Sequence, residues 1–303
     1  MAEISTVDRS GFSSRLAEFL AGKQKLLRDY FSAVSGSAGR LVFSLLYFVA
    51  LANTLSIAEF GLFATASAAG VMLSRVLAFG FISTLYRVST VRPQLIGAYT
   101  AGFLVMAVAS LPVLAAASAL TYAVFFAAEM GVRAFALVIV AEALLWRPFE
   151  LVVIVNNGLG RFGRAALLVI AGTMLRAVAA VLFMASAAPS LESWVWFYLA
   201  ANALSLLIAL STRYPRQRPR LRLELYWRRL PDALYIAGAE VLFYLQMEFD
   251  KLIVLSAGGP KLAGLYAIIM RLVDLTAIPI RTFTMMLVQR MMRTPELLAS
   301  IKV

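Results

Sequence analysis

Ser56-Ile57-Ala58-Glu59-Phe60-Gly61-Leu62-Phe63-Ala64 joins two apolar runs, each long enough to cross a membrane as a helix. Its pattern Gly-Leu-aromatic-Ala occurs again at Gly264-Leu265-Tyr266-Ala267, between two further apolar runs. In both places a small residue stands at a tight turn, and a helix that packs Leu, an aromatic residue and Ala follows it. The pattern indicates an internal repeat, in which one kind of helix pair is used twice.

The composition is that of a polytopic membrane protein. Of the 303 residues, 62% are hydrophobic and 15% are charged, whereas soluble domains are about half apolar and a quarter charged. The chain has neither Cys nor His, which removes thiol nucleophiles, imidazole bases, disulfides and the usual zinc and haem ligands, so we expect no metal and no cofactor. The net charge of +12 comes from basic residues between the apolar runs. It therefore predicts topology and not nucleic-acid binding.

Eight membrane spans are predicted after an N-terminal segment, residues 1–35. That segment places Leu and aromatic residues at helical spacing, with basic residues on the other faces. This suits either an amphipathic helix on the cytoplasmic membrane surface or a plain helical lead-in to the first span. The predicted spans are Leu41–Ala58, Phe60–Tyr86, Pro93–Ala128, Arg133–Val155, Ala165–Ala187, Ser193–Ser211, Pro231–Ser256 and Leu262–Val288.

The basic residues decide how often Pro93–Ala128 crosses the membrane. This uncharged run is long for one straight span and short for two spans with a turn. With a single crossing, Arg87, Arg92, Arg161 and the later arginine cluster all lie on one side, as the positive-inside rule requires. We therefore predict one long span, tilted or kinked near Pro112.

The predicted organisation has four parts. An amphipathic segment at 1–35 precedes a first six-helix lobe at 36–211, a basic cytoplasmic linker at 212–230, and the first helix pair of a second lobe at 231–303. The arginines of the linker could bind anionic lipid headgroups, although a role as topology anchor is favoured. Both ends of the chain are then cytoplasmic, and the two copies of the repeat run in the same direction.

Four arginines fall near the middle of predicted spans. An arginine at mid-helix costs at least ~2.5 kcal/mol, and four facing lipid would cost on the order of 10 kcal/mol, so we expect them to face an interior cavity. They are candidates for binding an anionic substrate, because a guanidinium group can bind two phosphate oxygens at once. The four are Arg75, Arg147, Arg176 and Arg271.

Ion pairing is the simpler interpretation of these charges. Arg147 and Glu150 are three residues apart, as are Arg271 and Asp274, so each pair could neutralise itself. The other two arginines have no acid within one turn of their own helix, which makes them the better candidates for an anionic substrate. The acids could couple transport to Na+ or H+, or pair with arginines of neighbouring helices, which is slightly favoured. These acids are Glu142, Glu150, Glu240, Glu248, Asp250 and Asp274.

Three loose motifs carry a family resemblance that covers nearly the whole chain. They are Leu55–Ala64 after the first span, Asn157–Gly163 before the fifth, and Phe249-Asp250-Lys251 leading to Gly264–Ala267. In these the chain resembles the Wzx-type polysaccharide flippases of the multidrug/oligosaccharidyl-lipid/polysaccharide (MOP) exporter superfamily. The resemblance implies an all-α bundle in the bacterial inner membrane. It also implies the activity, in which lipid-linked (polyprenyl-pyrophosphate) oligosaccharide moves to the periplasmic leaflet by alternating access, for O-antigen, capsule or exopolysaccharide export.

The chain departs from this family in one respect. Members look like two lobes of about six helices, whereas this sequence holds the first lobe and only the opening helix pair of the second. We expect either a truncated form, which is slightly favoured, or a second copy or polysaccharide-assembly partner that supplies the missing helices. Related members receive the pyrophosphate and sugar in a positively charged cavity, and some couple the movement to an ion gradient.

Three alternatives stay open. A MATE-like exporter of amphipathic cations would depend on interior carboxylates more than on arginines. A membrane enzyme such as a polysaccharide polymerase or ligase typically needs a large periplasmic loop, and the longest segment between spans, about 212–230, is placed in the cytoplasm. We therefore do not expect an enzyme. The third alternative is an inactive or structural protein.

Overall fold

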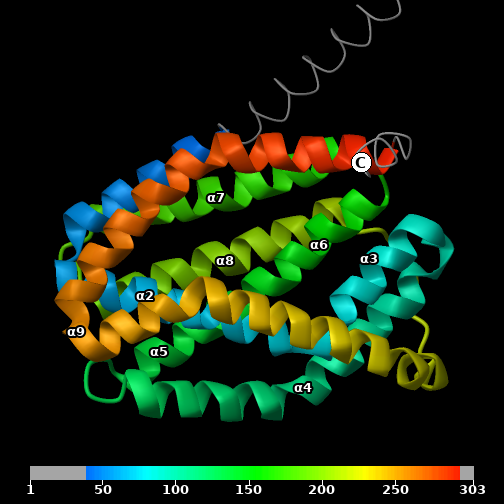
Figure 1. Cartoon of the computed structure of the whole chain (residues 1–303), viewed down its shortest axis with the longest axis horizontal. Coiled ribbons are helices and arrows are strands. Elements are labelled where there is room, and N and C mark those ends of the chain that lie inside the picture. The colour runs from blue at the N-terminus through cyan, green and yellow to red at the C-terminus, as the bar shows by residue number, and fades with distance from the viewer. Residues whose placement is uncertain (1–38, 294–303) are drawn as a thin grey trace, which may run out of the picture. The chain divides into compact units, whose positions relative to one another are not determined.

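The computed structural model describes the backbone of residues 39–293 and the side chains of residues 39–273. Every element in this part of the chain is a helix (Figure 1), as the composition predicts. Arg40–Leu272 form one compact unit by their contacts. The amphipathic helix predicted at 1–35 lies outside the described residues.

Five helical stretches of the described residues are long and apolar enough to cross a membrane, which fits a membrane helical bundle. They are Ile57–Val91, Pro93–Phe125, Phe162–Met184, Leu191–Arg213 and Leu223–Val273, and a shorter apolar helix, Gly39–Thr54, precedes them. The labelled elements are α2 (Ile57–Leu73), η1 (Ser74–Gly80), α3 (Phe81–Val91), η2 (Pro93–Leu95), α4 (Ile96–Phe125), α5 (Val132–Ile139), η3 (Val140–Trp146), α6 (Arg147–Gly158), α7 (Phe162–Met184), α8 (Leu191–Arg213) and α9 (Leu223–Arg293).

The second and third predicted spans differ in regularity. Pro93–Ala128 contains a single long helix, α4, as the positive-inside argument predicts. The span predicted at Phe60–Tyr86 is interrupted inside η1, where Ala78 has φ 56° and the following residue is also left-handed. The hydroxyl of Ser110 on α4 accepts a hydrogen bond from the Ala78 amide at 2.9 Å. This bond satisfies a backbone group that the break removes from the helix.

The two Gly-Leu-aromatic-Ala stretches contact each other in space. A Cβ atom at Gly61 on α2 would lie 2.3 Å from the carbonyl oxygen of Pro260 and 2.4 Å from the amide nitrogen of Gly264. A Cβ atom at Gly264 would lie 2.1 Å from the carbonyl oxygen of Ile57. Only glycine allows the two backbones to approach this closely. α9 changes direction just before this contact, at Gly259 (φ 73°), so the two last predicted spans meet there (Figure 1).

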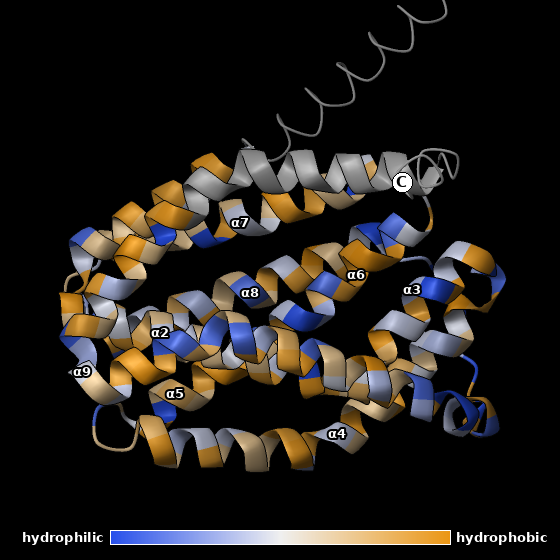
Figure 2. Ribbon diagram, in the orientation of Figure 1, coloured by the Kyte–Doolittle hydropathy of each residue, from blue (hydrophilic) through white to orange (hydrophobic). Residues whose placement is uncertain are grey.

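The basic linker is docked on the start of α4. The ring of Tyr226 is fully buried, and its hydroxyl donates to the carbonyl oxygen of Ala98 at 2.7 Å. The side chain of Gln217 accepts from the Gly97 amide at 3.0 Å and donates to the carbonyl oxygen of Pro93 at 2.9 Å. Hydrophilic residues gather at this end of the unit, while α4 is mostly hydrophobic (Figure 2). The linker thus fixes the start of α9 against α4.

Candidate functional site

The first charged cluster joins η1, α6 and α9 around Glu150. One carboxylate oxygen of Glu150 accepts from Arg75 at 3.1 Å and from Arg147 at 2.6 Å. Arg147 also donates to Glu240 on α9 at 2.7 Å. The guanidinium of Arg75 lies over the ring of Tyr244, 3.9 Å from its centroid, one turn after Glu240. We call these five residues the Glu150 cluster; they link three elements that are far apart in the sequence.

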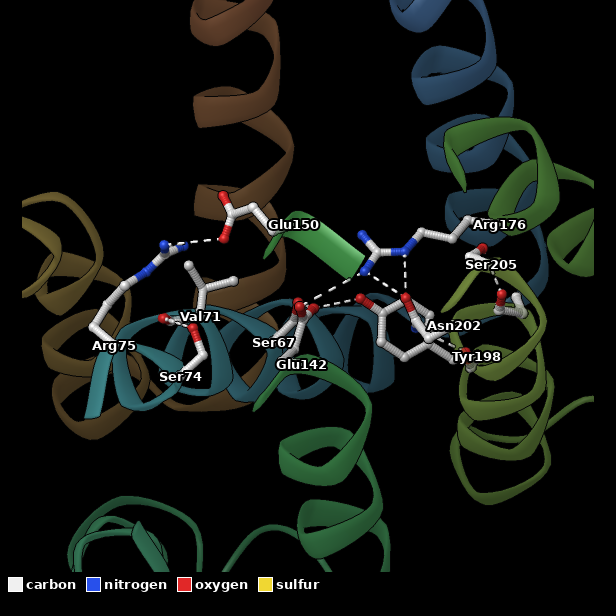
Figure 3. Close-up of polar contacts among 11 residues, drawn as sticks. Ser67, Val71, Ser74, Arg75, Glu142, Glu150, Arg176, Tyr198, Asn202 and Ser205 are labelled. Atoms are coloured by element: carbon white, nitrogen blue, oxygen red, sulfur yellow. Dashed lines mark hydrogen bonds and ion pairs between the residues drawn. The ribbon is translucent and has the colours of Figure 1, made fainter. Parts of the chain in front are cut away.

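The second cluster is built around Glu142, which is 2% exposed. Its carboxylate accepts hydrogen bonds from Ser67 at 2.6 Å and from the hydroxyl of Tyr198, and Arg176 lies 3.7 Å away (Figure 3). A Cβ atom at Gly70 would lie 2.9 Å from the Glu142 side chain, so the small residue on α2 makes room for the carboxylate. These contacts come from α2, α7 and α8 and define the Glu142 cluster.

Arg176 is held on several sides besides Glu142. Its Nε and one terminal nitrogen donate to the side-chain oxygen of Asn202 at 2.9 and 2.7 Å. Its guanidinium lies over the ring of Trp146, 3.6 Å from the centroid. This combination of a carboxylate, an amide and an aromatic face accounts for a cation placed within an apolar helix.

A local irregularity carries Glu142. It lies in η3, a stretch of wider π-helical turns directly before α6. Pro148, at the second position of α6, has no amide hydrogen, and its ring would clash with the carbonyl group of Leu144 in a regular helix. We attribute the wider turns to this clash. Such turns inside helices are frequent at functional sites.

One of the two predicted ion pairs within a helix is confirmed. Arg147 binds Glu150, as their spacing predicts. The side chain of Asp274 lies outside the described residues, so its pairing with Arg271 stays a prediction. Arg271 donates to the hydroxyl of Ser44 on the helix Gly39–Thr54.

The preference for Arg75 and Arg176 over Arg147 as anion-binding residues needs correction. Neither has an acid within one turn of its own helix, yet Arg75 pairs with Glu150 and Arg176 with Glu142. These carboxylates come from other helices, which spacing along one helix does not show. The slightly favoured expectation, that the acids pair with arginines of neighbouring helices, describes both clusters.

The remaining acids predicted for α9 form contacts of their own. Glu248 binds Lys251 at 2.5 Å, and Asp250 accepts a hydrogen bond from the hydroxyl of Tyr266. Both acids therefore have partners outside the Glu150 cluster. In the described part of the chain, no group of three or more Asp or Glu residues is arranged to hold a metal ion.

Two buried guanidinium groups keep an unused donor. The Nε atoms of Arg75 and Arg147 have no hydrogen-bond partner in the part of the chain that the structure describes. Their side chains are only 7% and 3% exposed, and a buried donor without a partner is unusual enough to require an explanation. These two donors make the cluster a candidate site for an oxyanion, although its formal charges are already paired.

Sequence reasoning missed Ser67, Tyr198, Asn202 and Trp146. Tyr198 and Asn202 are four residues apart on an apolar helix, so they share a face, and that spacing is the one signal that could have found them. Nothing along the sequence relates Ser67 or Trp146 to Glu142, because these contacts depend on how separate helices pack.

The fold and the two clusters define a helical-bundle membrane protein with paired charges in its interior. No protein-family model, no curated protein and no solved structure matches the chain.

Proposed function

We propose that this protein moves a lipid-linked oligosaccharide across the bacterial inner membrane and receives the diphosphate of its substrate at the Glu150 cluster. The observation that carries the proposal is the unused hydrogen-bonding capacity there. Arg75 and Arg147 donate to the same oxygen of Glu150, while the Nε atom of each has no partner among the described residues. A diphosphate supplies several oxygens in the geometry that guanidinium groups bind best.

The acids of the Glu150 cluster are more exposed than its arginines, and this difference gives a mechanism for substrate binding. Glu150 and Glu240 are 31% and 33% exposed, whereas the arginines that they bind are buried. An incoming diphosphate can replace the carboxylates on Arg75 and Arg147, and the displaced acids can be hydrated because they are already accessible. The arginines would then never be unpaired in an apolar environment, where an isolated charge is costly.

The repeat supports transport by two similar helix pairs. Gly61 and Gly264 bring α2 and α9 together through their backbones and not through interlocked side chains. Small residues at a helix contact let two backbones approach closely, and alternating access requires movement between two such groups of helices.

Complementation tests the function. The chain would be expressed in bacterial strains that each lack one polysaccharide flippase, for O-antigen, capsule or exopolysaccharide, and surface polysaccharide and lipid-linked precursor would be measured. We expect one strain to be restored by the wild type and by Arg133→Gln, which changes an exposed arginine outside both clusters. Arg75→Gln and Arg147→Gln should leave precursor accumulated at equal protein level in the membrane.

Two results would contradict the proposal. One is a stably inserted wild-type chain that restores none of the strains. The other is loss of export with Glu240→Gln but not with Arg75→Gln, together with resistance to amphipathic cations in cells that express the wild type. That second result would favour a MATE-like cation exporter.

A further inference from the structure

A second group of arginines lines a pocket at the end of the unit where the linker is docked. The pocket measures about 260 Å³ and lies between α3, the start of α4 and the start of α9. Three arginines, one aspartate and three hydroxyl side chains supply its polar lining, namely Arg87, Arg92, Arg229, Asp232, Ser83, Thr84 and Tyr99. Sites for drug-sized ligands measure roughly 300–1,000 Å³, so this pocket fits a compact group.

The charges of this pocket are not balanced. Asp232 lies 3.5 Å from Arg229. Arg87 and Arg92 have no carboxylate within ion-pair distance anywhere in the described part of the chain. Three arginines therefore line one pocket with a single acid among them, and two of the three have no carboxylate partner in the described part of the chain. A pocket with an excess of positive charge attracts anions.

The pocket is held in place by buried contacts. Arg229 follows one turn after Tyr226, whose ring is fully buried and whose hydroxyl bonds to Ala98 on α4. Gly102 on α4 also touches this ring, since a Cβ atom there would lie 2.7 Å from it. Arg229 is therefore carried by a fixed helix and not by a loose loop. A preorganised arrangement loses less entropy when it binds.

The position of the pocket and its apolar lining residues indicate a lipid. α3 ends at Val91 and α4 begins at Ile96, so the pocket lies at helix ends, where the headgroups of a surrounding bilayer are found. Besides the polar residues, Val88, Val91, Leu95 and Ile236 line the pocket, and Val91 is 67% exposed. An apolar wall next to these arginines suits a phosphate that is attached to a hydrocarbon chain.

We propose that Arg87, Arg92 and Arg229 form a binding site for the phosphate group of a membrane lipid, separate from the Glu150 cluster. The phosphate is either the phosphodiester of an anionic phospholipid or the diphosphate of a polyprenyl carrier. The hydroxyl of Thr84, which has no hydrogen-bond partner among the described residues, completes the donors. The site does not depend on the transport function, because it can be measured as binding alone.

Binding to the purified chain in phosphatidylcholine nanodiscs tests the site. Phosphatidylglycerol, a polyprenyl diphosphate and inorganic diphosphate would each be titrated at fixed salt. We expect at least one of the two lipids to bind, with about a tenfold weaker Kd in Arg87→Gln and in Arg229→Gln, the size expected for a lost charge-assisted hydrogen bond. The lipid that binds more tightly identifies the source of the phosphate.

Matched variants distinguish specific binding in the pocket from non-specific attraction of anions to positive charge. Arg216→Gln removes the same charge from the linker at a residue that does not line the pocket, and it should change Kd less than twofold. Arg87→Lys keeps the charge but loses the planar fork, so it should weaken binding nearly as much as Arg87→Gln.

Two outcomes would overturn the proposal. Equal losses in Arg216→Gln and Arg87→Gln would show attraction by overall charge only. Binding of inorganic diphosphate without binding of either lipid would show that the site takes a soluble anion. Neither outcome bears on whether the chain complements a flippase deletion.

Discussion

The arginines inside the bundle and those at the end that carries the linker have opposite surroundings. Arg75, Arg147 and Arg176 are largely buried and have carboxylate partners from other helices. Arg87 and Arg92 are exposed, and no acid of the described chain pairs with them. Depth in the membrane forces a charge to be paired, whereas a charge at a helix end can stay free because water solvates it. Arginines without a carboxylate partner are therefore found at the end of the bundle. Inside the bundle, a ligand must displace a carboxylate before it can bind an arginine.

Glu150→Ala should give the largest loss of stability, because it removes the carboxylate that two buried arginines inside the bundle share. It leaves Arg75 without a carboxylate and Arg147 with Glu240 alone. Removing one partner of a buried pair typically costs 3–5 kcal/mol, and the partial exposure of Glu150 places the expected loss near ~3 kcal/mol. Equilibrium unfolding in detergent micelles measures it. A loss below ~1 kcal/mol would mean that water already solvates Arg75.

Glu142→Gln should cost less, about 1–2 kcal/mol, because the substituted amide oxygen can still accept from Ser67 and Tyr198. Arg176 also keeps both hydrogen bonds to Asn202. A double-mutant cycle with Arg176→Gln isolates the energy of the charge pair. A coupling energy of zero would show that Asn202 and Trp146 hold Arg176 without help from the carboxylate.

Much of this bundle follows from the sequence, but its clusters do not. Apolar runs predict the helices, and the distribution of Arg87, Arg92 and Arg161 predicts that α4 crosses once. The Gly-Leu-aromatic-Ala pattern predicts two equivalent helix pairs, although nothing in it predicts that Gly61 and Gly264 touch. Contacts between helices depend on rotation and depth, which hydropathy does not determine.

The ion pairs also show that contacts between helices are not predicted by the sequence pattern. Spacing along a helix finds Arg147 and Glu150, because residues three apart are neighbours on its surface. It does not find Arg75 with Glu150, because α3, α4 and α5 lie between them in the sequence. Arg87 and Arg92 enter the sequence analysis only as topology markers, because the pocket that they line requires α9 and the docked linker to complete it.

Tyr244→Leu tests how far the aromatic ring contributes to pairing inside the bundle. The substitution removes the face on which Arg75 lies and leaves its ion pair with Glu150. We expect a loss of about 1 kcal/mol, within the range of cation–π contacts. Tyr244→Phe is the matched control, since it keeps the ring, and it should unfold like the wild type. Equal losses in the two variants would assign the effect to the hydroxyl instead.

Arg87→Gln should give the smallest effect on stability, because Arg87 belongs to the unpaired arginines at the helix ends. No carboxylate of the described chain loses a partner, and the excess positive charge of the pocket, with the repulsion that it causes, falls by one charge. In the absence of anions the free energy of unfolding should stay within ~0.5 kcal/mol of the wild type, with any gain fading at high salt as the repulsion is screened. Adding the lipid phosphate that binds should then stabilise the wild type more than the variant, because a ligand that binds only the folded state stabilises it by mass action. A loss as large as that of Glu150→Ala would show that Arg87 is a structural residue, and the distinction between paired interior arginines and free arginines at the helix ends would fail.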